Sequence, residues 1–151
     1  MKYWLMKSEP DVFSIDTLKT KKISGWDGVR NYQARNYMRD DMNIGDLILF
    51  YHSSCEVPGV AGLARVRKTS HPDPSQFDAK SEYFDPKATQ QTPRWFMVEV
   101  EFVEKFDHVI TLATIKNEKV LANMPLVQKG SRLSINPVTE KEYKTIIALK
   151  G

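Results

Sequence analysis

Cysteine is almost absent from this chain of 151 residues, in which Cys55 stands alone. A single cysteine excludes an internal disulfide and any cysteine-rich zinc site. His52, His71 and His108 lie far apart and show no metal-binding spacing, so we expect no metal site. The seven glycines form neither a G-x-G-x-x-G fingerprint nor a P-loop, which argues against dinucleotides and ATP. We therefore expect no cofactor.

Long hydrophobic runs are missing as well. The longest, Leu47 to Tyr51, is far shorter than the roughly 20 residues that span a bilayer. The apolar residues that follow Met1-Lys2 are too few for a signal peptide. We expect a cytoplasmic protein with no membrane partner. A hydrophobic fraction of 41% and a net charge of +3 are typical of an ordinary globule, compatible with a nucleic-acid partner.

The pattern of apolar residues predicts short strands and helices in irregular order. Strands are predicted at residues 3–6, 47–52, 60–67, 95–106 and 132–135. Helices are predicted at 15–21, after an N-cap at Ser14, and at 31–41, 111–118 and 139–149. Residues 70–93 are rich in proline and are expected to form a long loop. Without a β-α-β rhythm, this order predicts an α+β fold, a small mixed barrel in one domain spanning 1–151.

Polar and aromatic residues gather next to the predicted strands. Three segments stand out: Lys7-Ser8-Glu9-Pro10, Trp26-Asp27-Gly28-Val29-Arg30-Asn31 and Phe50-Tyr51-His52-Ser53. They supply aromatic faces, guanidinium and amide groups, and short hydroxyls. A pocket that sandwiches a flat heterocycle, reads its edge and holds its phosphates needs this chemistry. A polar rim around a sheet core would use the same residue types, so that alternative stays open.

The order and spacing of these motifs resemble those of the EVE-domain proteins, a family that includes the thymocyte nuclear proteins and many small bacterial members. The resemblance runs from about Tyr3 to Tyr143 and includes Ala34-Arg35-Asn36-Tyr37-Met38-Arg39, Tyr83-Phe84-Asp85-Pro86-Lys87, Arg94-Trp95 and Arg132-Leu133-Ser134. It implies a PUA-like mixed β-barrel of five to six strands flanked by short helices, with a cleft suited to a modified nucleobase. A more distant similarity connects the chain to YTH readers, whose aromatic cage is matched clearly only by Trp26. We expect Trp4 and Trp95 to be core residues.

The resulting hypothesis is a non-catalytic, monomeric module that binds a modified cytosine or adenine in DNA or RNA. Trp26 is predicted to stack on the flipped-out base, with Tyr51 as a second wall. Lys7, Ser8, Asn31 and Ser53 are candidates for the base edge, and Arg30 and Arg35, together with Lys7, for the phosphates. As a wall of a cleft, the Trp26 indole is expected to contribute only modestly to stability.

Other interpretations of the same residues remain. Trp26 and Tyr51 could be core residues, and Arg35 could form an ion pair with Asp40 or Asp46. His52 and Ser53 are adjacent on a predicted strand and point to opposite faces, which argues against a catalytic triad. Lys7 and Glu9 share one face, and such a pair could carry out general acid–base chemistry. The alternative function is therefore an amidohydrolase, as among the ASCH relatives of the family, acting on an acylated nucleoside.

Overall fold

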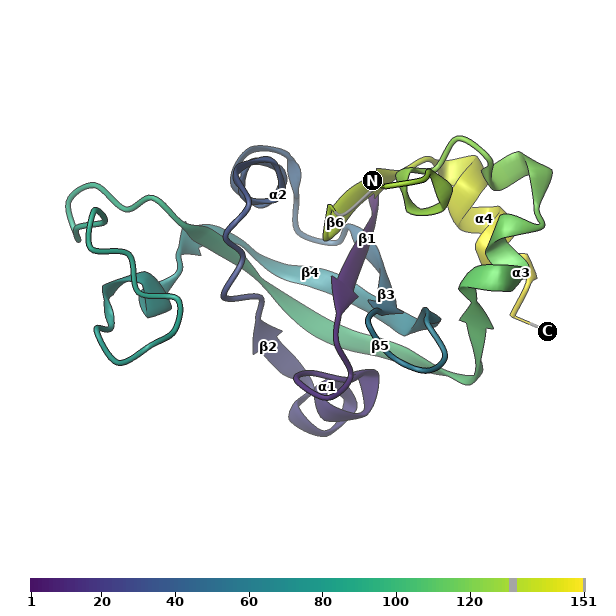
Figure 1. The fold of residues 1–151 in the computed structure, drawn as a ribbon, viewed down its shortest axis with the longest axis horizontal. Helices are drawn as coiled ribbons and strands as arrows, with labels where there is room; N and C mark the ends of the chain where they lie inside the picture. Colours follow the sequence, from purple (N-terminus) through teal and green to yellow (C-terminus); the bar gives the residue numbers. More distant parts are fainter. Residues whose placement is uncertain (131–132, 151) are drawn as a thin grey trace.

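The computed structural model describes residues 1–130 and 133–150. They form a mixed sheet with short helices around it (Figure 1). The six strands are β1 (Tyr3–Ser8), β2 (Ile23–Gly25), β3 (Leu47–His52), β4 (Gly59–Pro72), β5 (Phe96–Thr111) and β6 (Ile135–Val138). Their order across the sheet is β2-β5-β4-β3-β1-β6, with β1 and β3 parallel and the other pairs antiparallel. The α+β class is confirmed, and within the described residues the sheet is open between β2 and β6.

All four α-helices begin at a residue whose side chain caps the first turn. The helices are α1 (Ile15–Lys21), α2 (Tyr32–Asn36), α3 (Leu112–Lys116) and α4 (Glu140–Ala148). Ser14 accepts a hydrogen bond from the Thr17 N–H to start α1, as predicted. Thr139 and Glu142 form a capping box at the start of α4. Asn31 caps α2, which continues as a π-helical turn, η1 (Tyr37–Asp41). The short 3-10 helices are η2 (Pro74–Phe77), η3 (Lys119–Leu121) and η4 (Pro125–Val127).

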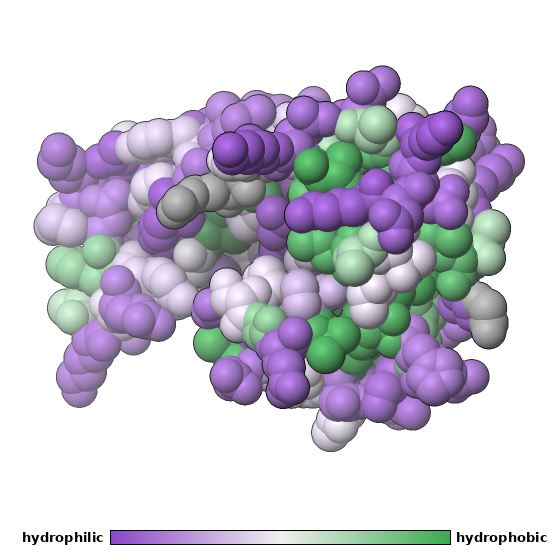
Figure 2. Space-filling model, turned by 45° about the vertical axis from the view of Figure 1, so that its right-hand side comes forward, coloured by the Kyte–Doolittle hydropathy of each residue, from purple (hydrophilic) through white to green (hydrophobic). Residues whose placement is uncertain are grey.

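The two faces of the sheet bury two separate hydrophobic clusters. Side chains alternate along β1 and β3, so that Trp4 and Phe50 enter one cluster while Leu5 and Tyr51 enter the other. Helices α1 and α2 contribute apolar residues to the first cluster, and α3 and α4 contribute to the second. Hydrophilic residues cover most of the face seen in Figure 2. No helix in the described part of the chain has both the length and the apolar character of a membrane span.

Several strand limits differ from those that periodicity predicts. Strand β2 was not expected, because three residues carry no periodic signal; it forms by pairing with the edge of β5. Strand β4 continues beyond its predicted end to Pro72, which pairs with Phe96, and β5 continues beyond its predicted end to Thr111, which pairs with Gly59. Strand β6 begins at Ile135, where the predicted strand 132–135 was expected to end. Arg132 of that prediction lies outside the described residues.

Candidate functional site

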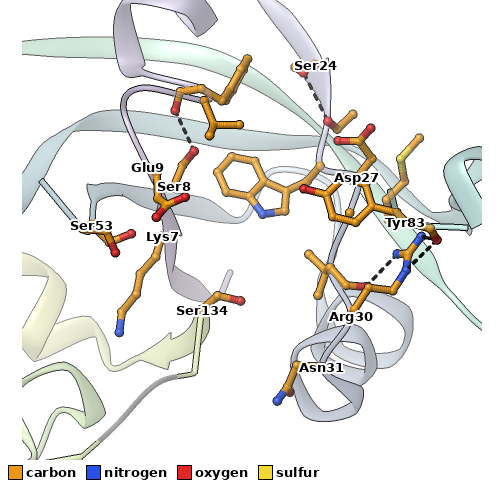
Figure 3. Close-up of a pocket in the computed structure, with 18 of the residues that line it drawn as sticks. Lys7, Ser8, Glu9, Ser24, Asp27, Arg30, Asn31, Ser53, Tyr83 and Ser134 are labelled. Atoms are coloured by element: carbon orange, nitrogen blue, oxygen red, sulfur yellow. Dashed lines mark hydrogen bonds between the residues drawn. The ribbon is translucent and has the colours of Figure 1, made fainter. Parts of the chain in front are cut away.

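A cavity of about 1010 Å³ lies where β1, β2 and β3 end (Figure 3). Strands β1 and β3 are parallel neighbours, so their carboxyl ends meet at one edge of the sheet. The Ser53 N–H donates to the Ser8 carbonyl over 3.0 Å and holds the two ends together. Six of the eight predicted site residues line this cavity: Lys7, Ser8, Trp26, Arg30, Asn31 and Ser53.

Trp26 belongs to both the cavity and the core. Its backbone N–H donates to the Val98 carbonyl over 2.8 Å and extends the pairing of β2 with β5. The indole packs edge-to-face on Phe50, at 5.6 Å between ring centroids, and on Phe13, at 6.2 Å. It is only 8% exposed. The expectation that it contributes little to the core is therefore wrong, and the indole forms the floor of the cavity.

The indole N–H groups distinguish the three tryptophans. Trp4 donates to Asp46 over 3.0 Å and Trp95 to Asp85 over 2.8 Å. The indole N–H of Trp26 has no acceptor within the described part of the chain. Its nitrogen is also not fully buried, unlike the Asn136 Oδ1 atom, which is buried without a partner. Because Trp26 lines the cavity, this unpaired indole N–H can be reached from the cavity. It is available to a ligand.

Lys7 presents an unpaired ammonium group at the opposite wall, where Figure 3 shows its side chain beside Ser53. Its backbone N–H donates to the Ser134 carbonyl over 2.8 Å, which fixes the end of β1. Partial burial lowers the pKa of Lys7 from its usual range. No acidic side chain among the described residues forms an ion pair with it. A cation placed in this way can donate to an electronegative ligand atom.

Two other predicted edge residues already use part of their hydrogen-bonding capacity. The Ser8 hydroxyl donates to the Phe13 carbonyl over 2.7 Å and braces the loop after β1. The Asn31 Oδ1 atom accepts from the Ala34 N–H over 2.9 Å as the cap of α2. The Ser8 hydroxyl oxygen can still accept a hydrogen bond, and the Asn31 Nδ2 group can still donate one.

Arg30 fixes the wall of the cavity instead of offering a free guanidinium group. Its nitrogens donate to the carbonyls of Val29 and Tyr83, to the Ser75 hydroxyl, and to Asp73 over 3.2 Å. A guanidinium group has five N–H donors, and these contacts engage all of them. This corrects the prediction of a phosphate contact: a phosphate would have to displace the bonds that position the loop bearing Tyr83.

Tyr83 also lines the cavity with an aromatic ring, and it comes from the long loop before β5. Its ring lies directly against Gly28, where a Cβ atom would come within 2.7 Å of the ring carbons. Gly28 also has a φ of +77°, a conformation that favours glycine. The carboxylate of Asp73 accepts from the Gly28 N–H over 2.8 Å and so joins the two segments. The sequence around Gly28 gives no sign that Tyr83 and Asp73, both far along the chain, pack against it.

Tyr51 and Arg35 lie elsewhere. Tyr51 is 3% exposed in the second core cluster, on the opposite face of β3 from Phe50. Burial raises its pKa to about 12. This corrects the prediction that it forms a second wall. Arg35 lies over the Tyr32 ring at 4.7 Å, beside the stacked Trp95, and donates to the Arg94 carbonyl. The alternative ion pair with Asp46 is also wrong, since Asp46 instead accepts from Trp4.

Sequence reasoning missed several residues that line the cavity, among them Phe13, Lys21, Asp27 and Tyr83. Asp27 follows Trp26 within the same motif, and this position could have indicated that Asp27 lines the cavity. The unusual length of the loop that carries Tyr83 was also a signal of function. Phe13 precedes α1 and Lys21 is the last residue of that helix, and nothing in their local sequence pattern indicates a site.

The fold and the cavity define a small α+β binding module with a ligand-sized, aromatic-floored cleft at one edge of its sheet. The model of the EVE domain matches residues 2–149. The chain therefore belongs to the EVE-domain family, as its motifs indicated.

Relatives of known sequence and structure agree with this assignment. Human thymocyte nuclear protein 1 is 40% identical, over 98% of this chain and 73% of its own length. A crystal structure of a Pseudomonas syringae protein superimposes with a TM-score of 0.95 at 50% identity, covering 99% of both chains. Human THYN1 in complex with 5-methylcytosine-containing DNA superimposes with a TM-score of 0.93 at 40% identity, covering 99% of this chain and 98% of that one. An ASCH mutant protein from Zymomonas mobilis, at 11% identity and a TM-score of 0.56, shares the fold alone.

Proposed function

We propose that this chain is a non-catalytic module that binds a modified nucleobase in the cavity floored by Trp26. The observation that carries the proposal is the indole itself, which borders the cavity and keeps its N–H unpaired within the described residues. The similarity to human THYN1, which was crystallised with 5-methylcytosine-containing DNA, makes this base the first ligand to test.

The size and polarity of the cavity suit a nucleotide. Ligand pockets commonly enclose about 300–1,000 Å³, and this cavity of about 1010 Å³ can take a base with its sugar and phosphate. Stacking on an aromatic side chain contributes about 1–3 kcal/mol, while extruding a base from a duplex costs a few kcal/mol. These two contributions nearly cancel. Affinity must therefore come from hydrogen bonds to the base edge and from phosphate contacts.

The polar groups of the cavity can supply the edge contacts. Lys7 Nζ, Asn31 Nδ2 and the indole N–H of Trp26 are donors, and the hydroxyls of Ser8 and Ser53 can act in either direction. For the phosphates we retain Lys7 and Arg35, while Arg30 is assigned to positioning Tyr83. Two such contacts predict that the logarithm of the affinity falls with the logarithm of salt concentration, with a slope of about −1.4 for a single strand.

Binding to labelled single-stranded oligonucleotides tests this proposal directly. Oligonucleotides that carry one 5-methylcytosine, one cytosine or one N6-methyladenine at the same position are titrated and followed by fluorescence anisotropy. We expect one modified base to bind more tightly than its unmodified counterpart. Tyr51→Phe is the matched control, because Tyr51 lies in the second core cluster and its variant should bind like the parent. Equal affinity for all three oligonucleotides would contradict the proposal.

The amidohydrolase alternative keeps one supporting observation, since Lys7 and Glu9 both line the cavity. The lowered pKa of Lys7 would also suit a general base. Against it, no ion pair joins these two residues in the described structure. We expect incubation with N4-acetylcytidine to leave the nucleoside unchanged. Turnover that is lost in Lys7→Ala and in Glu9→Gln would establish the enzyme instead of the reader.

A further inference from the structure

Asp27 and Glu9 are the two carboxylates that line the cavity, and neither forms an ion pair among the described residues; Asp27 is the one next to Trp26 in the chain. It follows Trp26 directly and lines the cavity, where its side chain is partly buried but still accessible to a ligand. Figure 3 shows it on the same side as Tyr83, across the cavity from Lys7 and Ser53. Among the described residues no lysine or arginine forms an ion pair with Asp27, whereas the nearby Asp73 is paired with Arg30.

The surroundings of Asp27 disfavour an ordinary surface role. Partial burial, and then the negative charge of Asp73, raise the pKa of the Asp27 carboxyl group. The charges of Arg30 and Lys21 oppose this shift but do not outweigh it. A carboxylate held near another carboxylate without an ion-pair partner gains stability when a ligand supplies a hydrogen-bond donor. The lining of the cavity therefore has carboxylate acceptors in Asp27 and Glu9 and donors in Lys7, Lys21 and Asn31. Of the two carboxylates, Asp27 lies on the side of Tyr83, across the cavity from Lys7 (Figure 3).

This polarity matches the hydrogen-bonding edge of cytosine. Cytosine presents the N4 amino group as a donor and N3 and O2 as acceptors. Thymine, which carries the same ring methyl group as 5-methylcytosine, presents O4 as an acceptor at the equivalent place and N3–H as a donor. An ionised carboxylate can only accept hydrogen bonds, and aspartate pairs with the cytosine N4 amino group in protein–DNA contacts.

We propose that Asp27 accepts a hydrogen bond from the exocyclic amino group of the bound base, so that the cavity takes 5-methylcytosine and rejects thymine. This inference rests on the proposed function and adds a specificity-determining residue to it. Thymine would place O4 against the carboxylate, leaving two acceptors face to face. The expected preference is about tenfold to a hundredfold, the discrimination that one well-placed base contact supplies.

The test compares two single-stranded oligonucleotides that differ only in 5-methylcytosine or thymine at one position. The wild-type chain should bind the 5-methylcytosine form at least about tenfold more tightly. In Asp27→Asn the new amide can donate to O4 as well as accept from N4, so the ratio should fall below about threefold. Asp27→Ala should lose the preference too. Asp107→Asn removes the same charge from an exposed position on β5 and should keep the wild-type ratio.

The outcomes separate this inference from the proposed function. If Asp27→Asn and Asp27→Ala fold and keep the wild-type ratio, Asp27 does not read the amino group. Equal wild-type affinity for the two bases, with weaker binding of an abasic oligonucleotide, would also overturn the inference but would leave a base reader. Wild-type binding of 5-methylcytosine that is no tighter than binding of the abasic form would instead reject the proposed function.

Discussion

Replacing Trp26 should weaken folding and binding together, because one indole serves both. The side chain is 8% exposed and packs on Phe13 and Phe50. Trp26→Ala should therefore lower the free energy of unfolding by about 3–5 kcal/mol, as for other large aromatic residues in cores. In a chain of this size that loss lowers the melting temperature by about 6–20 °C. The variant stays folded at 25 °C if the parent stability lies in the upper part of the usual range of about 5–15 kcal/mol.

Binding is measured on the folded population, with Trp26→Phe as the milder variant. Loss of the stacking face in Trp26→Ala should weaken binding of the preferred oligonucleotide by about 1–3 kcal/mol, roughly five- to a hundredfold or more. Trp4→Phe is the control: Trp4 shares the first core cluster but donates its N–H to Asp46, away from the cavity. It should lose stability and keep affinity. Normal affinity in both Trp26 variants, with their stability reduced, would refute the cavity assignment.

Three further predictions follow from contacts around the site. His52 Nε2 accepts from the Ile15 N–H at the start of α1, and burial lowers the pKa of His52 below its ordinary 6.5. The neutral imidazole therefore stabilises the fold above pH 6.5, and this contribution is lost as the pH falls through the lower folded-state pKa. Chemical denaturation at several pH values below 6.5 should show the decrease in the free energy of unfolding. In His52→Gln this pH dependence should be absent. Asp73→Asn should cost about 3 kcal/mol of stability in denaturation experiments, because Asp73 is fully buried and Arg30 would lose its anionic partner. Arg35→Ala should reduce the slope of the salt dependence of binding by about half and leave the preference among bases unchanged; an unchanged slope would remove Arg35 from the phosphate contacts.

Local signals in the sequence sufficed for elements whose determinants are near in the chain. The predicted cap at Ser14 is present, and the helix predicted at 139–149 begins after Thr139, where the structure shows a capping box; each cap joins residues three positions apart. Strand β3 has the predicted bounds because its apolar run is buried nearly throughout. By contrast, β2 is stabilised by pairing with β5, about 75 residues further along the chain. No local pattern in three residues can report such a partner.

The same distinction explains which site residues could be predicted. Lys7, Ser8 and Ser53 come together because β1 and β3 are adjacent and parallel, and their motifs stand directly at the strand ends. The engagement of Arg30 could not be predicted, because all of its partners except Val29 lie 43 to 53 residues away, in the segment that bears Tyr83. A free arginine and a fully engaged one look alike in a sequence.

Trp26 belongs both to the hydrophobic core and to the wall of the cavity, so the two interpretations of this residue do not exclude each other. A stacking face is useful only if it keeps its orientation when the ligand arrives, because ordering a mobile side chain costs free energy on binding. Edge-to-face packing on Phe13 and Phe50 supplies that rigidity from below. The unpaired N–H and the remaining exposed part of the indole face the cavity. Burial of Trp26 is therefore a condition for its proposed function, since a fully exposed tryptophan at this position would present the same ring without a fixed geometry.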